Sequence, residues 1–388
     1  MPRLDTLVMA WMSRLVTRGM AVMSRLDPRR WPSALTGRLS PRTLRNLRSE
    51  FRASGLAKIG VVLVTLAVLM AVFAPIIAPW NPTTQDREHA QEPPLGFSYT
   101  ETQVQPGEDG GVVNETVRVN ATVTHPLGTD GLGRDMASRV VYGARTSLIV
   151  GISGTLLAML IGVPIGLISG YYKGRLDDAL MRTADVSLAF PSLVLAIALV
   201  GLFGQAAVAV PDPLVVTGAA AAIRGAVSLP GGLTYPTGMP ETFTLPGTVI
   251  LVVGIVNWVW FARVARGEAL GVSEEAYVTA SRALGGSDRY VIARHVLPNS
   301  TTPILVLATI QVAAIVLLES ALSFLGFSGA TLSWGFDIAQ GRQYQTTAWW
   351  IAAMPGLAIV LTVIGVNLVG DWLRDALDPD IEGEGGGV

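Results

Sequence analysis

Long apolar runs with few charges alternate with polar segments along most of the chain. A helix needs about 20 largely apolar residues to cross the hydrocarbon core of a membrane. Runs of this length predict six transmembrane helices, at residues 59–79, 146–172, 186–211, 242–262, 295–318 and 343–370. A further apolar stretch, residues 214–223, is too short to cross and predicts a re-entrant or surface helix.

The segments outside these runs carry weaker patterns. Residues 117–123 alternate apolar with polar side chains, and residues 97–105 can pair with them across the turn-rich segment 106–111, which predicts a small β element. Residues 7–25 place apolar side chains at helical spacing with arginines elsewhere. That pattern fits either an amphipathic helix on the inner membrane face or an unstructured basic tail.

Basic residues indicate the orientation of the chain. Most of the 28 Lys and Arg residues lie in residues 1–58, 171–182, 263–302 and the C-terminal tail, all on one side of the predicted spans. Positive charge is enriched in cytoplasmic loops. We therefore expect both termini to be cytoplasmic, in a multi-pass protein of the cell membrane.

The fold class predicted is an all-α polytopic membrane protein with a small extracytoplasmic β element. The expected segments are a cytoplasmic tail (1–56), a first transmembrane helix (57–79), an extracytoplasmic loop (80–145), a five-helix core (146–370) and a cytoplasmic tail (371–388). Within the core, residues 204–245 form an extracytoplasmic insertion rich in Gly, Pro and Ala, and residues 263–302 form a long cytoplasmic loop.

Composition agrees with a membrane protein and excludes several other classes. The chain is 50% hydrophobic and 15% charged, with a mean hydropathy of +0.48, whereas soluble domains carry about 25% charged residues. A net charge of −1 argues against a nucleic-acid partner. There is no cysteine, and the three histidines lack the spacing of metal ligands, so we expect no metal site.

The sequence offers no enzyme motif. A P-loop requires Gly-Lys followed by Ser or Thr, but Lys58 follows Ala57 and Lys173 follows Tyr172. We expect no catalytic residues and no cofactor bound by this chain. The chain is therefore expected not to be a P-loop ATPase itself.

Small residues recur every fourth position in the second predicted span. They are Gly154, Ala158, Gly162, Gly166 and Gly170. Such a stripe lets another helix approach closely, and it predicts a packed helix–helix seam.

Acidic residues are scarce within the spans, which disfavours a proton- or sodium-coupled carrier. Asp185 lies at the start of the third run and Glu319 at the outer end of the fifth. Glu319 either lines a substrate path or forms an ion pair or cap at a helix end.

The 263–302 loop is too long for a tight turn and is rich in helix formers. Two helical segments joined at Gly285-Gly286 fit it. A loop of this kind, on a membrane bundle with no motor of its own, suggests a docking element for another protein.

This loop resembles the cytoplasmic loop of ABC importer permeases, in particular the C-type subunit for dipeptides, oligopeptides and nickel. The family pattern is Glu-Ala-Ala, three residues, Gly, nine residues, Ile, one residue, Leu-Pro. The spacing is kept here, with Thr, Ser and His in place of Glu, the second Ala and Ile. The matching positions are Thr279, Ala280, Ser281, Gly285, His295, Leu297 and Pro298.

Further segments match the same family in order. They lie at residues 125–148, 185–200, 294–299, 317–327, 333–335 and 367–379, and the resemblance covers roughly residues 45–380. It implies an N-terminal helix added to the five-helix core of type I importers. Gly285 and Pro298 also fit a helix C-cap and a helix start, and we interpret His295 as a helix-surface residue.

The resemblance implies one half of the translocation pathway of an ATP-driven importer. The partners implied are a second, B-type permease, cytoplasmic ATPase subunits that bind ATP and Mg²⁺, an extracytoplasmic solute-binding protein and membrane lipid. Peptides are the first choice of substrate, with nickel chelates and sugars left open, and no substrate-binding residue is identified. An ion-coupled carrier working without an ATPase is the alternative.

Overall fold

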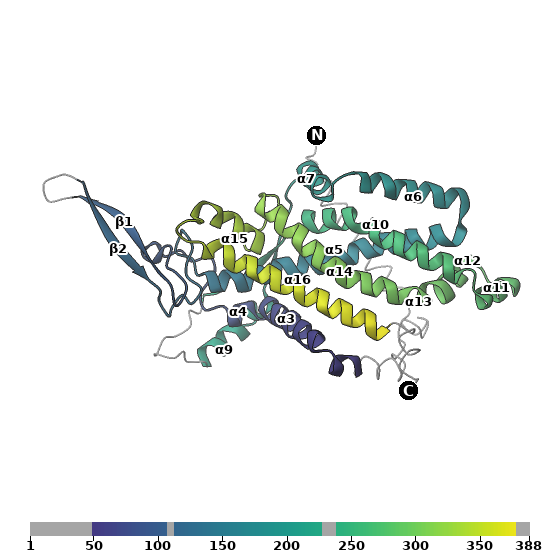
Figure 1. Ribbon diagram of the computed structural model, residues 1–388, viewed down its shortest axis with the longest axis horizontal. Coiled ribbons are helices and arrows are strands. Elements are labelled where there is room, and N and C mark those ends of the chain that lie inside the picture. The colour runs from purple at the N-terminus through teal and green to yellow at the C-terminus, as the bar shows by residue number, and fades with distance from the viewer. Residues whose placement is uncertain (1–48, 107–111, 227–237, 378–388) are drawn as a thin grey trace, which may run out of the picture.

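The computed structural model describes residues 49–106, 112–226 and 238–377. This part of the chain is an elongated helical bundle with a β-hairpin projecting from one end and short helices at the other (Figure 1). The predicted amphipathic helix at 7–25 lies outside the described residues.

Long apolar helices form the bundle, and the prediction of a helical membrane protein is confirmed. In the described residues, five single helices are long and apolar enough to cross a membrane. They are α3 (Gly55–Val72), α5 (Met136–Tyr172), α10 (Gly247–Val272), α14 (Thr301–Phe324) and α16 (Trp350–Leu377). A sixth span exists if the bent pair α6 (Gly174–Ala189) and α7 (Ser192–Phe203) is counted as one.

The third predicted run, residues 186–211, is not one straight helix. Its helices α6 and α7 meet at an angle of 92°. Phe190 has an extended backbone with ψ 136° because the following Pro191 disfavours helical geometry in the residue before it. Helix α7 then ends at Gly204, where φ is +77°, and the rest of the run enters a strand.

Other helix ends also differ from the predicted runs. Helix α5 begins at Met136, ten residues before the apolar run, with the Asp135 side chain capping its first turn. At about 1.5 Å per residue, its 37 residues span about 55 Å, so it extends well beyond a bilayer core. Helix α10 likewise continues into the predicted loop, whereas α14 starts only at Thr301.

Two small sheets lie at the end of the bundle that the sequence predicts to be extracytoplasmic, here called the outer end. Strand β1 (Ser98–Pro106) pairs antiparallel with β2 (Val112–Asn120), which confirms the predicted β element. A second sheet, which the sequence did not predict, joins β3 (Val208–Pro211) to β4 (Thr242–Leu245) at the two ends of the insertion. Between them the short apolar stretch forms α8 (Pro213–Val216) and α9 (Ala219–Ala226).

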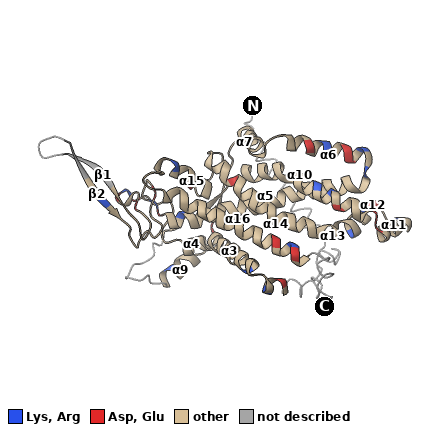
Figure 2. Cartoon of the chain, viewed as in Figure 1, with Lys and Arg blue, Asp and Glu red and all other residues tan. Residues whose placement is uncertain are grey.

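Short helices complete the two ends of the molecule. The outer end has α4 (Ala74–Ile77), the 3-10 turns Arg87–His89 and Arg342–Tyr344, and α15 (Trp334–Gly341). The other end has α11 (Ala276–Ala283), α12 (Asp288–Val291), a π-helical turn (Ile292–Val296) and α13 (Leu297–Asn299). Charged residues are sparse along the middle of the bundle and frequent toward α6, α12 and the end of α16 (Figure 2).

Candidate functional site

A helix–turn–helix unit connects α10 to α14 and contains the predicted docking loop. Its turn depends on two glycines. Gly285 has φ +85°, a conformation that L side chains rarely adopt. The N–H of Gly286 donates to the Ser281 carbonyl at 3.0 Å, and a Cβ at Gly286 would lie only 2.8 Å from that oxygen. The pair therefore lets α12 fold back beside α11.

The structure divides the seven predicted loop residues into two groups. Thr279, Ala280, Ser281 and Gly285 lie at the tip, in α11 and the turn after it, with Ser281 partly buried and the others exposed. The second group lies at the junction with α14, which consists of the π-helical turn and α13. Its members are His295, Leu297 and Pro298.

His295 links the two arms of the unit. Its ring lies 6.0 Å from the ring of Tyr277 and 5.7 Å from that of Tyr290, measured between centroids. Tyr277 belongs to α11 and Tyr290 to α12. His295 therefore takes part in an aromatic group that spans both helices.

The unit exposes three large apolar side chains. Leu284 is 89% exposed, and Tyr277 and Tyr290 are about half exposed. The sequence analysis missed these three residues, although Leu284 directly precedes the predicted glycine. Grouped exposed apolar side chains mark surfaces that a partner covers.

The opposite face of the unit is buried against the bundle. Val278 in α11, Val291 in α12 and Val296 in the π-helical turn are fully buried. They pack in one cluster with Leu167 and Tyr171 near the end of α5. The unit therefore moves with the ends of the long helices rather than hanging from a flexible loop.

Polar contacts join the same surfaces. The Tyr171 hydroxyl donates to Asp288 Oδ1 at 2.8 Å and accepts from Arg282 Nε at 3.0 Å. Just beyond α5, Lys173 Nζ donates to Glu274 Oε1 at 2.9 Å. The ammonium of Lys173 holds the pKa of the Glu274 carboxyl below its usual range.

The predicted small-residue stripe lies along the contact between α5 and α10. A Cβ on Gly162 would lie 2.7 Å from Phe261 Cβ, and one on Gly170 would lie 2.8 Å from Ala269 Cβ. Gly154 meets Val253 in the same way, Gly166 meets Ala265, and Ala158 is fully buried. Real Cβ atoms essentially never approach so closely, so α5 and α10 depend on these small residues for their spacing.

Glu319 holds two helices together and does not lie in an open path. Its side chain is fully buried in α14, and it accepts hydrogen bonds from Ser147 Oγ of α5 at 2.8 Å and from Ser323 Oγ at 2.6 Å. Asp185 lies at the surface and pairs with Arg263 at 2.7 Å. Glu319 and Asp185 therefore do not form a pair of acids of the kind that an ion-coupled carrier would need.

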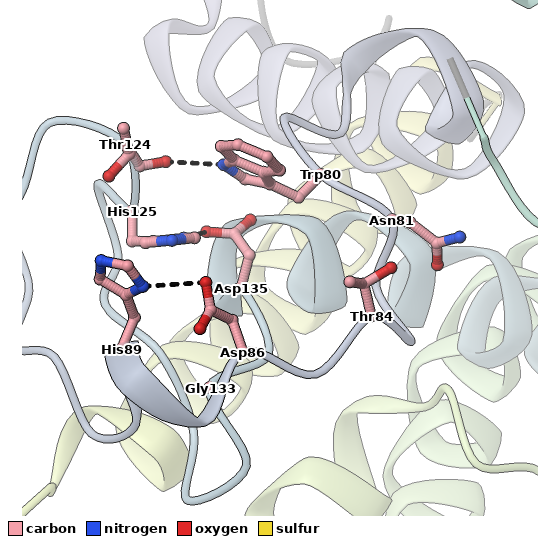
Figure 3. Close-up of a pocket in the computed structure, with 9 residues that line it drawn as sticks. All are labelled: Trp80, Asn81, Thr84, Asp86, His89, Thr124, His125, Gly133 and Asp135. Carbon is pink, nitrogen blue, oxygen red and sulfur yellow. Dashed lines mark hydrogen bonds and ion pairs between the residues drawn. The ribbon is translucent and has the colours of Figure 1, made fainter. Parts of the chain in front are cut away.

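The outer end contains a pocket of about 200 Å³ that the sequence analysis did not predict (Figure 3). Two His–Asp pairs line it: His89 Nδ1 lies 2.8 Å from Asp86 Oδ2, and His125 Nδ1 lies 3.1 Å from Asp135 Oδ1. The hydrogen bond to Asp86 raises the pKa of His89, and the same bond lowers the pKa of Asp86. Within the described ranges, no group of three or more His, Cys, Asp or Glu side chains is arranged to hold a metal ion.

Three buried arginines stabilise the outer end of the bundle. Arg145 pairs with Asp212 and donates to the carbonyls of Ala71 and Val72. Arg224 donates to carbonyls in the segment 75–79. The third, Arg139, pairs with Asp337 of α15 and donates to the carbonyl of Pro82. Together they hold the segment that follows α3 against the rest of the bundle.

Two family models match the chain. Residues 162–383 match the model described as binding-protein-dependent transport system inner membrane component. Residues 44–94 match the N-terminal transmembrane domain of oligopeptide transport permease C. The two matches contain α3, α10, α14 and α16 in full, but only residues 162–172 of α5.

Curated relatives are similar over most of their length. The di/tripeptide transport system permease protein DppC of Pseudomonas aeruginosa is 33% identical over 346 residues, covering 88% of this chain and 94% of that protein. The oligopeptide transport system permease protein OppC of Bacillus subtilis is 32% identical, covering 86% and 88%. The probable D,D-dipeptide transport system permease protein DdpC of Escherichia coli is 31% identical, covering 86% and 90%.

Proposed function

Because the chain belongs to the family of binding-protein-dependent transport system inner membrane components, we propose that it is a permease subunit of an ATP-driven peptide importer. It forms one half of the translocation pathway, and a second, B-type permease forms the other half. Peptides are the proposed cargo because the relatives described above carry peptide transport in their names. This assignment supersedes the ion-coupled carrier.

One observation carries the proposal of an ATPase partner. The unit between α10 and α14 presents the exposed side chains of Leu284, Tyr277 and Tyr290, while its other face is buried in the bundle. An apolar tip on a rigid base suits insertion into a cleft of a cytoplasmic subunit. ATP and Mg²⁺ bind to that subunit, and this chain has no catalytic role of its own.

The orientation proposed follows from the charge distribution. In the sequence, most Lys and Arg residues lie in the segments expected to be cytoplasmic, which include the unit with α11 and α12. Both termini are then cytoplasmic, and the hairpin β1–β2 and the insertion face outward. An extracytoplasmic solute-binding protein delivers cargo to that outer face, membrane lipid surrounds the apolar helices, and nucleic acid is not a partner.

The docking surface is tested by co-expressing the chain with its neighbouring permease and ATPases and purifying the assembly. Leu284→Asp places a charge at the most exposed of the three apolar side chains, so we expect the ATPase subunits to be lost from the purified assembly. Val123→Asp is the matched control, because Val123 is also an exposed apolar residue, 78% exposed, but it lies at the outer end. Copurification of ATPase with Leu284→Asp at the wild-type level would refute the docking site.

The cargo is tested separately by reconstituting the wild-type assembly with its binding protein in liposomes. We expect ATP-dependent uptake of labelled tri-alanine that unlabelled peptides suppress and that nickel chelates and sugars do not. Suppression by a nickel chelate or a sugar alone would reassign the cargo while leaving the ATPase docking intact.

A further inference from the structure

Tyr171 of α5 contacts both α11 and α12, the two arms of the helix–turn–helix unit, which is called the docking unit from here on. It lies in the last turn of α5, and its side chain is only 4% exposed. Its ring belongs to the same buried cluster as Val278 of α11 and Val291 of α12. Its hydroxyl hydrogen-bonds to Arg282 on α11 and to Asp288 at the start of α12.

The two hydrogen bonds have opposite directions. The hydroxyl accepts from Arg282 Nε at 3.0 Å and donates its proton to Asp288 Oδ1 at 2.8 Å. Both partners are charged, and hydrogen bonds to charged groups are roughly twice as strong as neutral ones. The Arg282 guanidinium also lies over the Tyr171 ring, with Cζ 4.3 Å from the centroid. One side chain therefore fixes the relative position of both arms.

Tyr171 also lies at the end of a continuous helix that runs through the bundle. Gly166 and Gly170 bring the same segment of α5 into close contact with α10. At its other end, the single helix α5 carries Arg139 and Arg145, which bind the outer segments. A displacement of the docking unit would therefore move α5 through Tyr171, and α5 extends to the outer end of the bundle.

A second polar contact at the same place is a weaker candidate. Lys173 and Glu274 also join the end of α5 to the loop, but their side chains are 45% and 74% exposed. Exposed ion pairs contribute little to stability or positioning. Tyr171 is buried and has two charged partners, so Tyr171 rather than the Lys173–Glu274 pair fixes the docking unit to the end of α5.

We propose that the Tyr171 hydroxyl is a positioning group that couples movement of the docking unit to α5. The inference rests on the proposed function, since it requires an ATPase bound at the tip. Tyr171 itself touches neither ATP nor cargo. Its role is to keep α11 and α12 in a fixed relation to α5 while the ATPases open and close.

The test compares Tyr171→Phe with Tyr172→Phe in the complete assembly in liposomes. Phe at 171 keeps the ring and its contact with Arg282 but removes both hydrogen bonds. Tyr172 is the matched control, because it carries the same hydroxyl but is half exposed, and its ring contacts that of Tyr171 edge-on at 5.2 Å. The measurement is the stimulation of ATP hydrolysis by the binding protein loaded with tri-alanine, divided by the unstimulated rate.

We expect Tyr171→Phe to retain its ATPase subunits but to lose stimulation by at least about tenfold, because the loss of even one of its two hydrogen bonds to charged groups corresponds to that factor. The loss should lie in the stimulated kcat, with KM for ATP unchanged, because the nucleotide site is untouched. Tyr172→Phe should match the wild type. Stimulation of Tyr171→Phe within twofold of the wild type would overturn the proposal and leave the residue a packing role.

A second pair of variants covers the case in which Tyr171→Phe fails to assemble. Asp288→Asn and Arg282→Gln each remove one charged partner and leave the phenol in place. We expect each to lower stimulation, and the double variant Tyr171→Phe/Asp288→Asn to be no worse than Tyr171→Phe alone, because coupled residues are not additive. Wild-type stimulation in both single variants would refute the proposal that these hydrogen bonds couple the docking unit to α5. If instead the wild-type assembly lacks ATPase or stimulation, the proposed function itself has failed.

Discussion

The contact between α5 and α10 allows a measurement of how much the glycine stripe contributes to stability. A Cβ on Gly166 would lie 2.8 Å from Ala265 Cβ and closer still to the Ala262 carbonyl, whereas an ordinary contact is 3.4–4 Å. Both neighbours belong to α10, and a backbone oxygen cannot rotate away. Gly166→Ala therefore forces the helices apart, and overpacking of this kind costs about 1–3 kcal/mol.

A control for helix propensity is available on the other side of the same contact. Gly267 lies in α10 with nothing within 4 Å of its Cβ position. Gly→Ala in a helix gains about 1 kcal/mol from propensity at either site. That gain cancels between the two variants, so their difference in unfolding free energy isolates the steric cost and should equal about 1–3 kcal/mol.

The assay is unfolding of the purified chain in mixed micelles with increasing dodecyl sulfate, followed by the fluorescence of its nine tryptophans. Gly267→Ala should unfold at the same or a higher detergent fraction than the wild type, and Gly166→Ala at a lower one. Equal midpoints for the two variants would show that α5 and α10 are not in the close contact described above.

Two further predictions concern the outer pocket. Gly133 and Gly96 both have a positive φ, but a Cβ on Gly133 would overlap the Asp86 carbonyl while one on Gly96 meets nothing; Gly133→Ala should therefore lower the melting temperature more than Gly96→Ala, and equal losses would contradict this reasoning. In an NMR titration of the chain's histidines, His89 should titrate above its usual pKa, and Asp86→Asn should return it toward that value. The pKa of His89 is raised and that of Asp86 is lowered, so their contact stabilises the loop fully between roughly pH 4 and 6.5. The stabilisation is lost as pH rises through the pKa of His89 or falls through that of Asp86. An unchanged His89 titration in Asp86→Asn would refute the pairing.

The sequence predicted the apolar helices well because the requirement for length and low charge is local. It placed the start of α5 ten residues too late, since Arg139 and Arg145 interrupt the apolar pattern. Both arginines are buried, and their partners Asp337 and Asp212 lie 198 and 67 residues away. The local hydrophobic pattern carries no information about such distant partners. A buried, paired arginine therefore cannot be distinguished in the sequence from an arginine in an exposed loop.

The docking unit shows the same limit. Its turn was predicted, because a positive φ and close approach require glycine at specific positions. Tyr171 was not predicted, because its partners Arg282 and Asp288 lie 111 and 117 residues away. The bend between α6 and α7 was also missed, although Pro191 marks its position in the sequence. The uncharged run 186–211 predicts one span, because low charge and length alone do not show where a helix stops.

The buried arginines of the outer end set an order of events for biogenesis. Helix α3 is made first, yet the guanidinium groups that donate to carbonyls of the segment 71–79 come from Arg145 and Arg224, which are synthesised later. Buried donors and acceptors need partners, so the first helix reaches its final state only after the insertion has folded over it. The N-terminal helix lies at the edge of the bundle, but its outer end is held in place by residues that come later in the sequence.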